Sequence, residues 1–345
     1  MMSNIPYNVK EKIGRNLYTN PNHPICITKQ KIYDIIGFTR EKFEGLDPYV
    51  SVKANFDDLL IPGDHPSRSK SDTYYKDENT VLRTHTSAHQ TELISKGHKN
   101  FLVTGDVYRR DEIDAFHYPV FHQMEGVTIY DYVMSDEEMK MIMMTELGML
   151  INGLFPNRQY RLDDSYFPFT DLSGEIEVDL DGKWVEVLGC GRIKNEILEA
   201  CGMKGCSGWA FGLGIERLAM IFFKIPDIRY FWTEDERFSG QFENGKETTF
   251  KEYSDYPNVI RDISFYYPEG FDKNDFFHTL NMHAQNLVAN AMVVDEFYNP
   301  KNERKSYSFR IFFESLERTL LSEEVNQILD SVKKTLVEEF GVEIR

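Results

Sequence analysis

The stretch FLVTGDVYRRDEIDAFHYPVFHQMEG, residues 101–126, decides the architecture of the larger part of this chain. Period-two spacing groups Phe101, Val103, Gly105, Val107 and Arg109 in its first nine positions, and Phe121, Gln123, Glu125, Val127 and Ile129 in the return segment, residues 120–130. Successive side chains of a strand point to opposite faces, so this spacing predicts two strands. A charged connection joins them. We therefore expect a long antiparallel hairpin.

One face of the returning strand carries an unusual mixture of side chains. Gln123 and Glu125 share that face with three apolar residues: Phe121, Val127 and Ile129. A solvated outer face would account for the amide and the carboxylate. However, a carboxylate among apolar side chains is seldom buried without a partner. The ammonium group of a ligand would supply that partner, and both interpretations stay open at this point.

A second polar group lies at an expected helix start, LRTHTSAHQ, residues 82–90. Thr86 or Ser87 is well placed to be the N-cap of a helix that stops at Gly97. A cap does not explain the imidazole of His85 beside it. A hydroxyl and an imidazole at a helix N-terminus can also hold the polar end of a ligand.

Two aromatic side chains follow in the segment YFPFT, residues 166–170. In an extended chain Phe167 and Phe169 project to the same side. Aromatic residues of strands usually belong to the core, but two rings that face one way can also clamp a third ring. Further along, Asp181-Gly182 is a strong signal for a two-residue hairpin turn.

Glycines precede an apolar helix in GCSGWAFGLGIERLAMIFFKIP, residues 205–226. The helix is apolar all round, so we expect it to be buried. Glu216 and Arg217 at its start therefore need partners, and a helix N-terminus behind glycines suits an anionic ligand. A core helix with a structural ion pair is the alternative. The chain contains neither a dinucleotide fingerprint nor a P-loop.

Pattern and composition divide the chain into four segments: an N-terminal arm (1–47), a larger domain that carries nearly all the unusual residues (48–236), a linker (237–253) and a C-terminal domain (254–345). In the last segment we expect strands at residues 259–267, 291–298, 306–313 and 342–345, and helices at 273–288 and from Ser322 to Gly341. This β-α-β-β-α-β order is that of a ferredoxin-like unit. The fold class is therefore α+β, with an antiparallel sheet in the larger domain.

The composition excludes several classes of protein. No apolar run reaches the roughly 18 residues of a membrane span. The formal net charge of −17 argues against a general nucleic-acid binder, so any RNA would meet local basic patches. The four cysteines form no Cys-x-x-Cys pair and fit reduced thiols of an intracellular protein. The N-terminus lacks the Arg-rich character of a mitochondrial presequence.

Taken in order, these segments resemble the motifs of class II aminoacyl-tRNA synthetases, in the version found in single-chain, mitochondrial-type phenylalanyl enzymes. VYRRDE with FHQMEG resembles motif 2, FGLGIER resembles motif 3, and THTSAHQ and YFPFT are phenylalanine-specific neighbours. The C-terminal unit, which opens with YPNVIRDISF, resembles the anticodon-binding domain of the same family. The resemblance covers nearly the whole chain. It implies ATP-dependent ligation of L-phenylalanine to tRNA-Phe through a phenylalanyl-adenylate, with ATP and Mg²⁺ and without an editing domain.

The resemblance also implies a role for each matching residue. Arg109 matches the motif 2 arginine that holds the α-phosphate of ATP, and it is the candidate catalytic residue. His117 matches a residue near the outer phosphates, and Phe121 and Arg217 would enclose the adenine ring. The phenylalanine-binding set is matched by His85, Ser87, Gln123, Glu125, Phe167, Phe169, Thr170, Cys190 and Ala210. Glu186 is our candidate for a Mg²⁺ ligand.

Partners and location follow from the same resemblance. The candidates for tRNA contacts form a basic cluster: Arg261, Lys301, Arg304, Lys305 and Arg310. We expect a monomer in the mitochondrial matrix, with its presequence absent or removed, and the cytoplasm as the alternative location. Other interpretations stay open: a C-terminal module that merely packs on the larger domain, a ligase that activates an amino acid without tRNA, and a non-catalytic paralogue.

Overall fold

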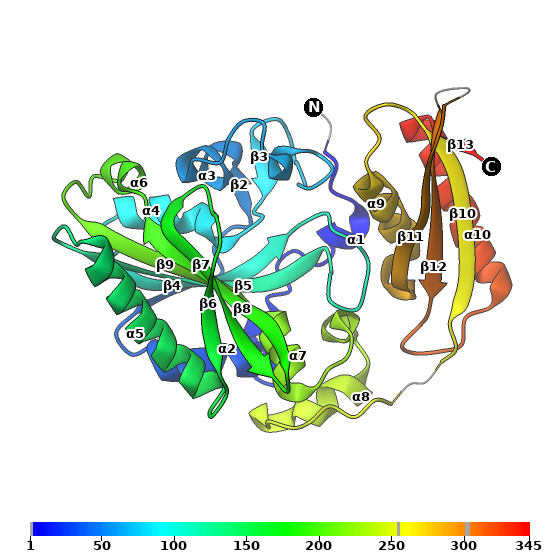
Figure 1. Cartoon of the computed structure of the whole chain (residues 1–345). Coiled ribbons are helices and arrows are strands. Elements are labelled where there is room, and N and C mark those ends of the chain that lie inside the picture. Colours follow the sequence, from blue (N-terminus) through cyan, green and yellow to red (C-terminus); the bar gives the residue numbers. More distant parts are fainter. Residues whose placement is uncertain (1–2, 254–255, 301–303) are drawn as a thin grey trace.

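The computed structural model describes residues 3–253, 256–300 and 304–345, which form a larger and a smaller part (Figure 1). The larger part is built on a seven-stranded sheet with the strand order β1-β4-β5-β9-β8-β7-β6. Its strands are β1 (Glu41–Glu44), β4 (Asn100–Tyr108), β5 (Val120–Tyr130), β6 (Tyr160–Asp164), β7 (Thr170–Leu180), β8 (Lys183–Ile193) and β9 (Ser207–Gly214). β1 runs parallel to β4, and the other neighbouring pairs are antiparallel. The predicted α+β class is confirmed.

Strands β4 and β5 form the hairpin expected from residues 101–126. Gly105 lies opposite Gln123 in this pair, and β9 places Gly212 opposite Glu125 on the other side of β5. A Cβ added at Gly212 would meet no atom within 4 Å. This glycine therefore leaves open space above the face of the sheet that carries Gln123 and Glu125.

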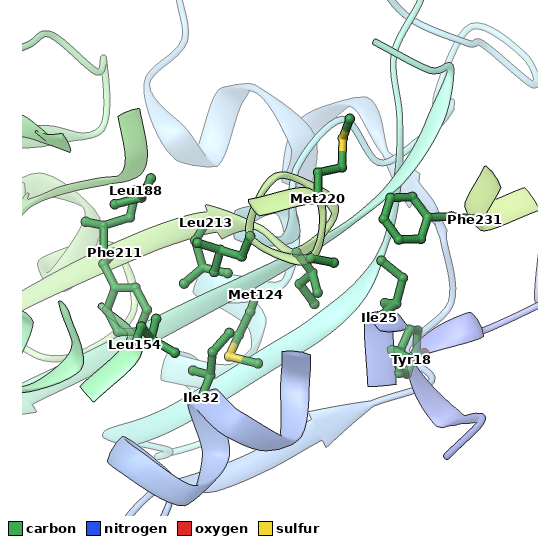
Figure 2. Close-up of a cluster of buried hydrophobic side chains, with 14 of the residues drawn as sticks. Tyr18, Ile25, Ile32, Met124, Leu154, Leu188, Phe211, Leu213, Met220 and Phe231 are labelled. Carbon is green, nitrogen blue, oxygen red and sulfur yellow. The ribbon is translucent and has the colours of Figure 1, made fainter. Parts of the chain in front are cut away.

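Three helices cover the opposite face of the sheet: α2 (Pro24–Ile36), α5 (Asp136–Leu154) and α7 (Ile215–Phe223). Figure 2 shows how their apolar side chains meet those of the strands, with Ile32 of α2 beside Met124 of β5 and Leu154 of α5 beside Phe211 of β9. Full burial of one such side chain contributes roughly 1.5–3 kcal/mol. This cluster therefore fixes the sheet on which the candidate site lies.

The first 47 residues do not form a separate arm. Tyr18 and Ile25 are fully buried, and they belong to the same apolar cluster as the sheet (Figure 2). Pro24 occupies the first turn of helix α2, where a proline is tolerated. The helix ends before Gly37.

The segment 237–253, expected to be a polar linker, also packs against this core. It contains most of helix α8 (Glu236–Ser239). The side chains of Phe238, Phe242 and Phe250 are buried, and the rings of the last two lie 5.3 and 5.6 Å from that of Phe238. The many polar residues of the segment favour a linker over a packed segment. Its three phenylalanines anchor it instead.

The smaller part has the element order of the predicted ferredoxin-like unit. In chain order its elements are β10 (Val259–Tyr267), α9 (Lys273–Ala284), β11 (Val288–Asn299), β12 (Arg304–Phe313), α10 (Ser322–Phe340) and β13 (Glu343–Ile344). The strand order in the sheet is β11-β12-β10-β13. Helix α10 stops at Gly341, whose φ of 66° is the left-handed cap that glycine adopts without strain. Helix α9 ends before residue 288, because Val288 belongs to β11.

The turn of the β4–β5 hairpin connects the two parts. Nη2 of Arg110 lies 3.2 Å from Oδ1 of Asp275 on α9. The backbone N–H of Ala291 on β11 donates a hydrogen bond of 3.0 Å to the carbonyl oxygen of Ile113. The hairpin that carries Gln123 and Glu125 is thereby held against the C-terminal unit.

Short elements complete the larger part: α1 (Tyr7–Lys10), β2 (Tyr49–Ser51), α3 (Val52–Asn55), β3 (Thr80–Leu82), α4 (Gln90–Ser95) and α6 (Asn195–Ala200). Strands β2 and β3 pair with each other in a two-stranded sheet of their own. None of the helices in the described ranges is both long and apolar enough to cross a bilayer.

Candidate active site

Two adjoining cavities lie over the face of the sheet that carries Gln123 and Glu125. Their volumes are about 690 and about 220 Å³, and they share five wall residues: Arg109, Asp111, Gln123, Glu186 and Gly212. The larger cavity is lined by all nine residues expected to bind phenylalanine: His85, Ser87, Gln123, Glu125, Phe167, Phe169, Thr170, Cys190 and Ala210. The smaller cavity is lined by His117, Phe121 and Arg217. The fold thus brings the predicted site residues together.

Glu125 is the most unusual ionisable group of the larger cavity. Its side chain is 2% exposed, and its Oε2 has no hydrogen-bond partner among the described residues. Burial raises the pKa of this carboxyl to about 8, although a hydrogen bond with Ser87 acts in the opposite direction. A carboxylate at this position is costly unless a cation accompanies it. The interpretation of this face as a solvated outer surface is therefore wrong.

His85 stands before a short 3-10 helix, Thr86–His89, which leads into α4. No side chain caps the start of either helix, so the expected cap by Thr86 or Ser87 is wrong. Burial, followed by the nearby charge of Arg109, lowers the pKa of His85 to about 3. The imidazole is therefore neutral at physiological pH, and it can donate or accept a hydrogen bond without bringing charge into the cavity.

Phe167 and Phe169 form one wall of the larger cavity. Their ring centroids are 6.0 Å apart, with an angle of 23° between the planes. Gly189 of β8 lies behind the first ring: a Cβ at that position would be only 2.8 Å from Cζ of Phe167. This glycine allows the ring to lie against the strand. Both phenylalanines keep partly exposed faces, so neither is an ordinary core residue.

Three small or medium side chains line the larger cavity near the two rings. Ala210, Cys190 and Thr170 are 5%, 3% and 4% exposed. Burial raises the pKa of the Cys190 thiol to about 12, so it stays protonated and is a poor nucleophile. The hydroxyl of Thr170 lies 2.7 Å from that of Ser173, which satisfies its polarity within the protein. These three side chains therefore make this part of the larger cavity suitable for an uncharged, apolar group.

Arg109 lies where the two cavities meet. Its Nε donates a hydrogen bond of 2.8 Å to the carbonyl oxygen of Thr84, and its guanidinium carbon is 5.2 Å from the ring centroid of Phe121. The terminal nitrogens make no hydrogen bond within the described part of the chain. An anion at the junction of the cavities could therefore receive these donors.

The smaller cavity has two charged groups at its border, each in an ion pair. Nη1 of Arg217 is 3.0 Å from Oε2 of Glu186, and both side chains are half-exposed. Nδ1 of His117 is 2.8 Å from Oδ2 of Asp114, and this hydrogen bond raises the pKa of His117. His117 therefore carries positive charge over a wider pH range than a free histidine, which suits a neighbour of phosphate groups.

One buried pair near this cavity was only half predicted. The sequence indicated that Glu216 needs a partner, and the structure identifies that partner as His122, at 2.6 Å. His122 itself was not singled out, because the alternation of β5 places it on the face opposite Phe121 and Gln123. A buried carboxylate at a helix start was the only signal in the sequence.

The basic cluster expected to contact tRNA is divided between two faces of the smaller sheet. Arg310 pairs with Asp262 on the face that the helices leave open, and Arg304 lies 3.6 Å over the ring of Tyr266 there. Arg261 has the opposite strand parity and bonds to Asn326 of α10, on the helix side. Lys305, opposite Tyr267, shares that parity. Lys301 lies outside the described residues.

The mostly antiparallel sheet with its double cavity is that of a class II aminoacyl-tRNA synthetase. A family model described as "tRNA synthetases class II core domain (F)" matches residues 6–242. A second model, "Ferredoxin-fold anticodon binding domain", matches residues 254–345. Together the two matches cover nearly the whole chain.

Three relatives identify the family within this class. The chloroplastic/mitochondrial phenylalanine–tRNA ligase of Arabidopsis thaliana is 46% identical over 99% of this chain and 83% of that protein. The mitochondrial phenylalanine–tRNA ligases of Dictyostelium discoideum and Mus musculus are each 38% identical over 99% of this chain, and over 89% and 86% of their own length. The chain belongs to the family of single-chain phenylalanine–tRNA ligases of mitochondria and chloroplasts.

Proposed function

We propose that the two cavities carry out the activity of this family here, the ATP-dependent ligation of L-phenylalanine to tRNA-Phe through a phenylalanyl-adenylate. One observation supports this most directly. The aromatic pair of Phe167 and Phe169 and the buried carboxyl of Glu125 line a single cavity, which meets the smaller cavity at Arg109. An apolar ring, an ammonium group and a phosphate would each find a suitable partner there.

The larger cavity binds the amino acid in this proposal. Glu125 accepts the α-ammonium group, which provides the cation that its buried carboxylate needs. His85, Ser87 and Gln123 are the other polar groups at this end. The benzyl ring packs against Phe167 and Phe169, where each offset or edge-to-face contact contributes about 0.5–1.5 kcal/mol beyond burial. Ala210, Cys190 and Thr170 limit the size of the ring.

The smaller cavity binds the nucleotide. The adenine ring lies between Phe121 and Arg217, the α-phosphate meets Arg109, and His117 is near the outer phosphates. The ion pair between Arg217 and Glu186 must open when Arg217 moves onto the adenine ring. Because both partners are half-exposed, opening this pair costs little, on the order of 0–1 kcal/mol.

Mg²⁺ fits the same place. Among the described residues no group of three or more acidic, histidine or cysteine side chains could hold a metal ion by itself. Mg²⁺ bound to a nucleotide needs only one or two carboxylates, because phosphates and water fill the other positions. Glu186 borders both cavities, and the opening of its ion pair frees its carboxylate for this purpose. When bound, the ion neutralises phosphate charge.

Adenylation requires no nucleophile from the protein, since the amino acid carboxylate attacks the α-phosphorus and pyrophosphate leaves. The contribution of the chain is to position both substrates and to stabilise the developing charge. The terminal N–H groups of the Arg109 guanidinium stabilise this developing charge. The 2′-hydroxyl of the terminal adenosine of tRNA then attacks the adenylate and releases AMP.

The open face of the smaller sheet is the part that meets tRNA. It carries Arg310 and also Arg304, which lies over the ring of Tyr266, and a cation next to an aromatic ring is suited to unstacked bases and their phosphates. Arg310 is paired with Asp262 and Arg304 with Glu343, so RNA has to compete with these carboxylates. We propose a monomer in the mitochondrial matrix, with the cytoplasm as the alternative, because several relatives are named as mitochondrial.

A ligand-bound crystal structure tests this assignment. The probe is a non-hydrolysable phenylalanyl-adenylate analogue soaked into the protein. We expect its ring between Phe169 and Ala210, its ammonium group within 3.2 Å of Glu125 and its phosphate on Arg109. A ring bound elsewhere, or an ammonium group remote from Glu125, would overturn the assignment.

A further inference from the structure

Phe121 and Arg217, the two residues expected to enclose the adenine ring, are the sequence neighbours of His122 and Glu216, which form a buried pair. Phe121 precedes His122 on β5, and Arg217 follows Glu216 on α7. The side chains of His122 and Glu216 are 0% and 2% exposed. Nδ1 of His122 lies 2.6 Å from Oε1 of Glu216, and the backbone N–H of His122 donates to Oε2 over 2.8 Å. One carboxyl group thus holds both the side chain and the backbone of its partner.

The reason for this double contact lies in the sheet. Strand β9 pairs with β5 only as far as Gly214 opposite Gln123, and the chain then turns into α7. Beyond that point β9 offers His122 no carbonyl group. The carboxylate of Glu216, in the first turn of α7, takes the place of the missing acceptor. Glu216 therefore links the start of α7 to β5 at the point where its pairing with β9 ends.

The surroundings of His122 hold its ring in one orientation. The imidazole is stacked on Trp232, at 5.6 Å and 14°, and Tyr18 packs against it edge-on at 5.7 Å. Its Nε2 has no hydrogen-bond partner among the described residues. A carboxylate in its ionised form can only accept, and towards that form Nδ1 of His122 acts as the donor. Rotation of this ring would leave two buried polar groups unpaired, which is expensive.

We propose that His122 and Glu216 are positioning residues for the nucleotide: their hydrogen bonds set the separation of Phe121 and Arg217, and thereby the affinity for the adenine ring. A planar base fits between the side chains of Phe121 and Arg217 in the bound state only when the backbones that carry them lie at the right separation, and these backbones belong to different elements, β5 and α7. Glu216 borders the smaller cavity, whereas His122 does not. The inference rests on the proposed binding of adenine between Phe121 and Arg217.

A purely structural pair would also explain the burial, so the test needs matched variants. His122→Phe keeps a stacking ring on Trp232 but removes the donor. His122→Asn loses the ring but keeps an amide N–H near the position of Nδ1. Glu216→Gln keeps the volume but cannot accept both hydrogen bonds while Nδ1 is protonated. Glu146→Gln, which weakens the pair of Arg40 with Glu146 behind the sheet, is the control.

The measurements are the KM values for ATP and for phenylalanine in pyrophosphate exchange, and the Tm with and without ATP. We expect His122→Phe to raise the KM for ATP about tenfold, the effect of one lost hydrogen bond to a charged group, and to leave the KM for phenylalanine unchanged. His122→Asn should lower the Tm but keep the KM for ATP close to that of the wild type. Glu146→Gln should change the Tm alone. Should His122→Phe fail to fold, Glu216→Gln decides.

Phe121→Ala tests the proposed adenine site separately from the positioning role of His122 and Glu216. If it leaves the KM for ATP unchanged, the proposed adenine site and this inference fall together. If it raises the KM for ATP while both His122→Phe and Glu216→Gln only lower the Tm, the inference alone is overturned.

Discussion

Nε of Arg109 donates a hydrogen bond to the carbonyl oxygen of Thr84, which immediately precedes His85, so the charge at the junction of the cavities is fixed to the amino-acid side of the site. We predict that Arg109→Ala slows phenylalanine-dependent pyrophosphate exchange. The expected loss of transition-state stabilisation is roughly 2.7–4 kcal/mol, the range found for one oxyanion donor.

Arg158→Ala is the matched control for this change, because Arg158 pairs with Asp181 on the surface and borders neither cavity. It should leave exchange unchanged. An exchange rate of Arg109→Ala within about threefold of the wild type, far smaller than the effect of such a donor, would remove Arg109 from its role.

The raised pKa of Glu125 predicts that phenylalanine binding releases a proton. In the free enzyme this carboxyl has a pKa of about 8, so it is largely protonated at pH 7. It must ionise to accept the ammonium group. Isothermal titration at pH 7 in buffers of different ionisation enthalpy should therefore show release of close to one proton, and much less release at pH 9.5. Equal proton release at both pH values would contradict this role.

The same shift predicts the pH dependence of stability without ligand. The folded-state pKa of about 8 lies above the ordinary value of 4.5, so the folded state binds more protons than the unfolded state between these values. The contribution of Glu125 to stability is present below pH 4.5 and is lost as pH rises to about 8. Glu125→Gln removes this loss. Its Tm relative to wild type should rise between pH 5 and pH 9, while its KM for phenylalanine increases about tenfold or more.

The size of the amino-acid cavity predicts a limited selectivity against larger rings. Apolar pockets reject an added hydroxyl only by a factor on the order of 10², so we expect detectable charging with tyrosine. Ala210→Gly should enlarge the space and raise kcat/KM for para-substituted phenylalanines relative to phenylalanine. Ala291→Gly, in a strand of the smaller part and equally buried, is the control for the loss of stability. No gain with such analogues would contradict the placement of Ala210.

Because Arg310 lies on the open face of the smaller sheet, we predict that its substitution weakens tRNA binding and leaves amino acid activation unchanged. Arg310→Glu should raise the KM for tRNA-Phe in charging and leave pyrophosphate exchange unchanged, because the residue is remote from both cavities. Arg261→Glu changes a charge on the helix side of the same sheet and should have a smaller effect. An equal effect of the two variants would exclude the open face as the contact surface.

Much of this structure could be predicted from the sequence. The β4–β5 hairpin follows from the period-two spacing of its side chains. The turn at Asp181 and Gly182 follows from residue types that tolerate positive φ, and both residues adopt such angles. The ferredoxin-like order follows from apolar periodicity and from the stop at Gly341. These features depend on local chemistry that a single sequence displays.

Other features could not be predicted, because they depend on contacts between distant segments. Tyr18 and Phe238 are buried by elements far away in the chain, so their segments looked like an arm and a linker. The pairing of His122 with Glu216 joins residues 94 positions apart. The basic cluster is divided between two faces because Arg261 and Lys305 have the strand parity of the helix-facing residues, whereas Arg304 and Arg310 have the opposite parity.

A single experiment can test whether the site selects a benzyl-bearing amino acid, activates it with ATP and passes it to tRNA. The measurement is tRNA charging with each of the twenty amino acids and total tRNA, with pyrophosphate exchange measured in parallel. We predict that phenylalanine is charged far faster than any other amino acid, with tyrosine as a weak second. Exchange without charging would indicate a ligase that does not use tRNA, and the absence of phenylalanine-dependent exchange would contradict the account.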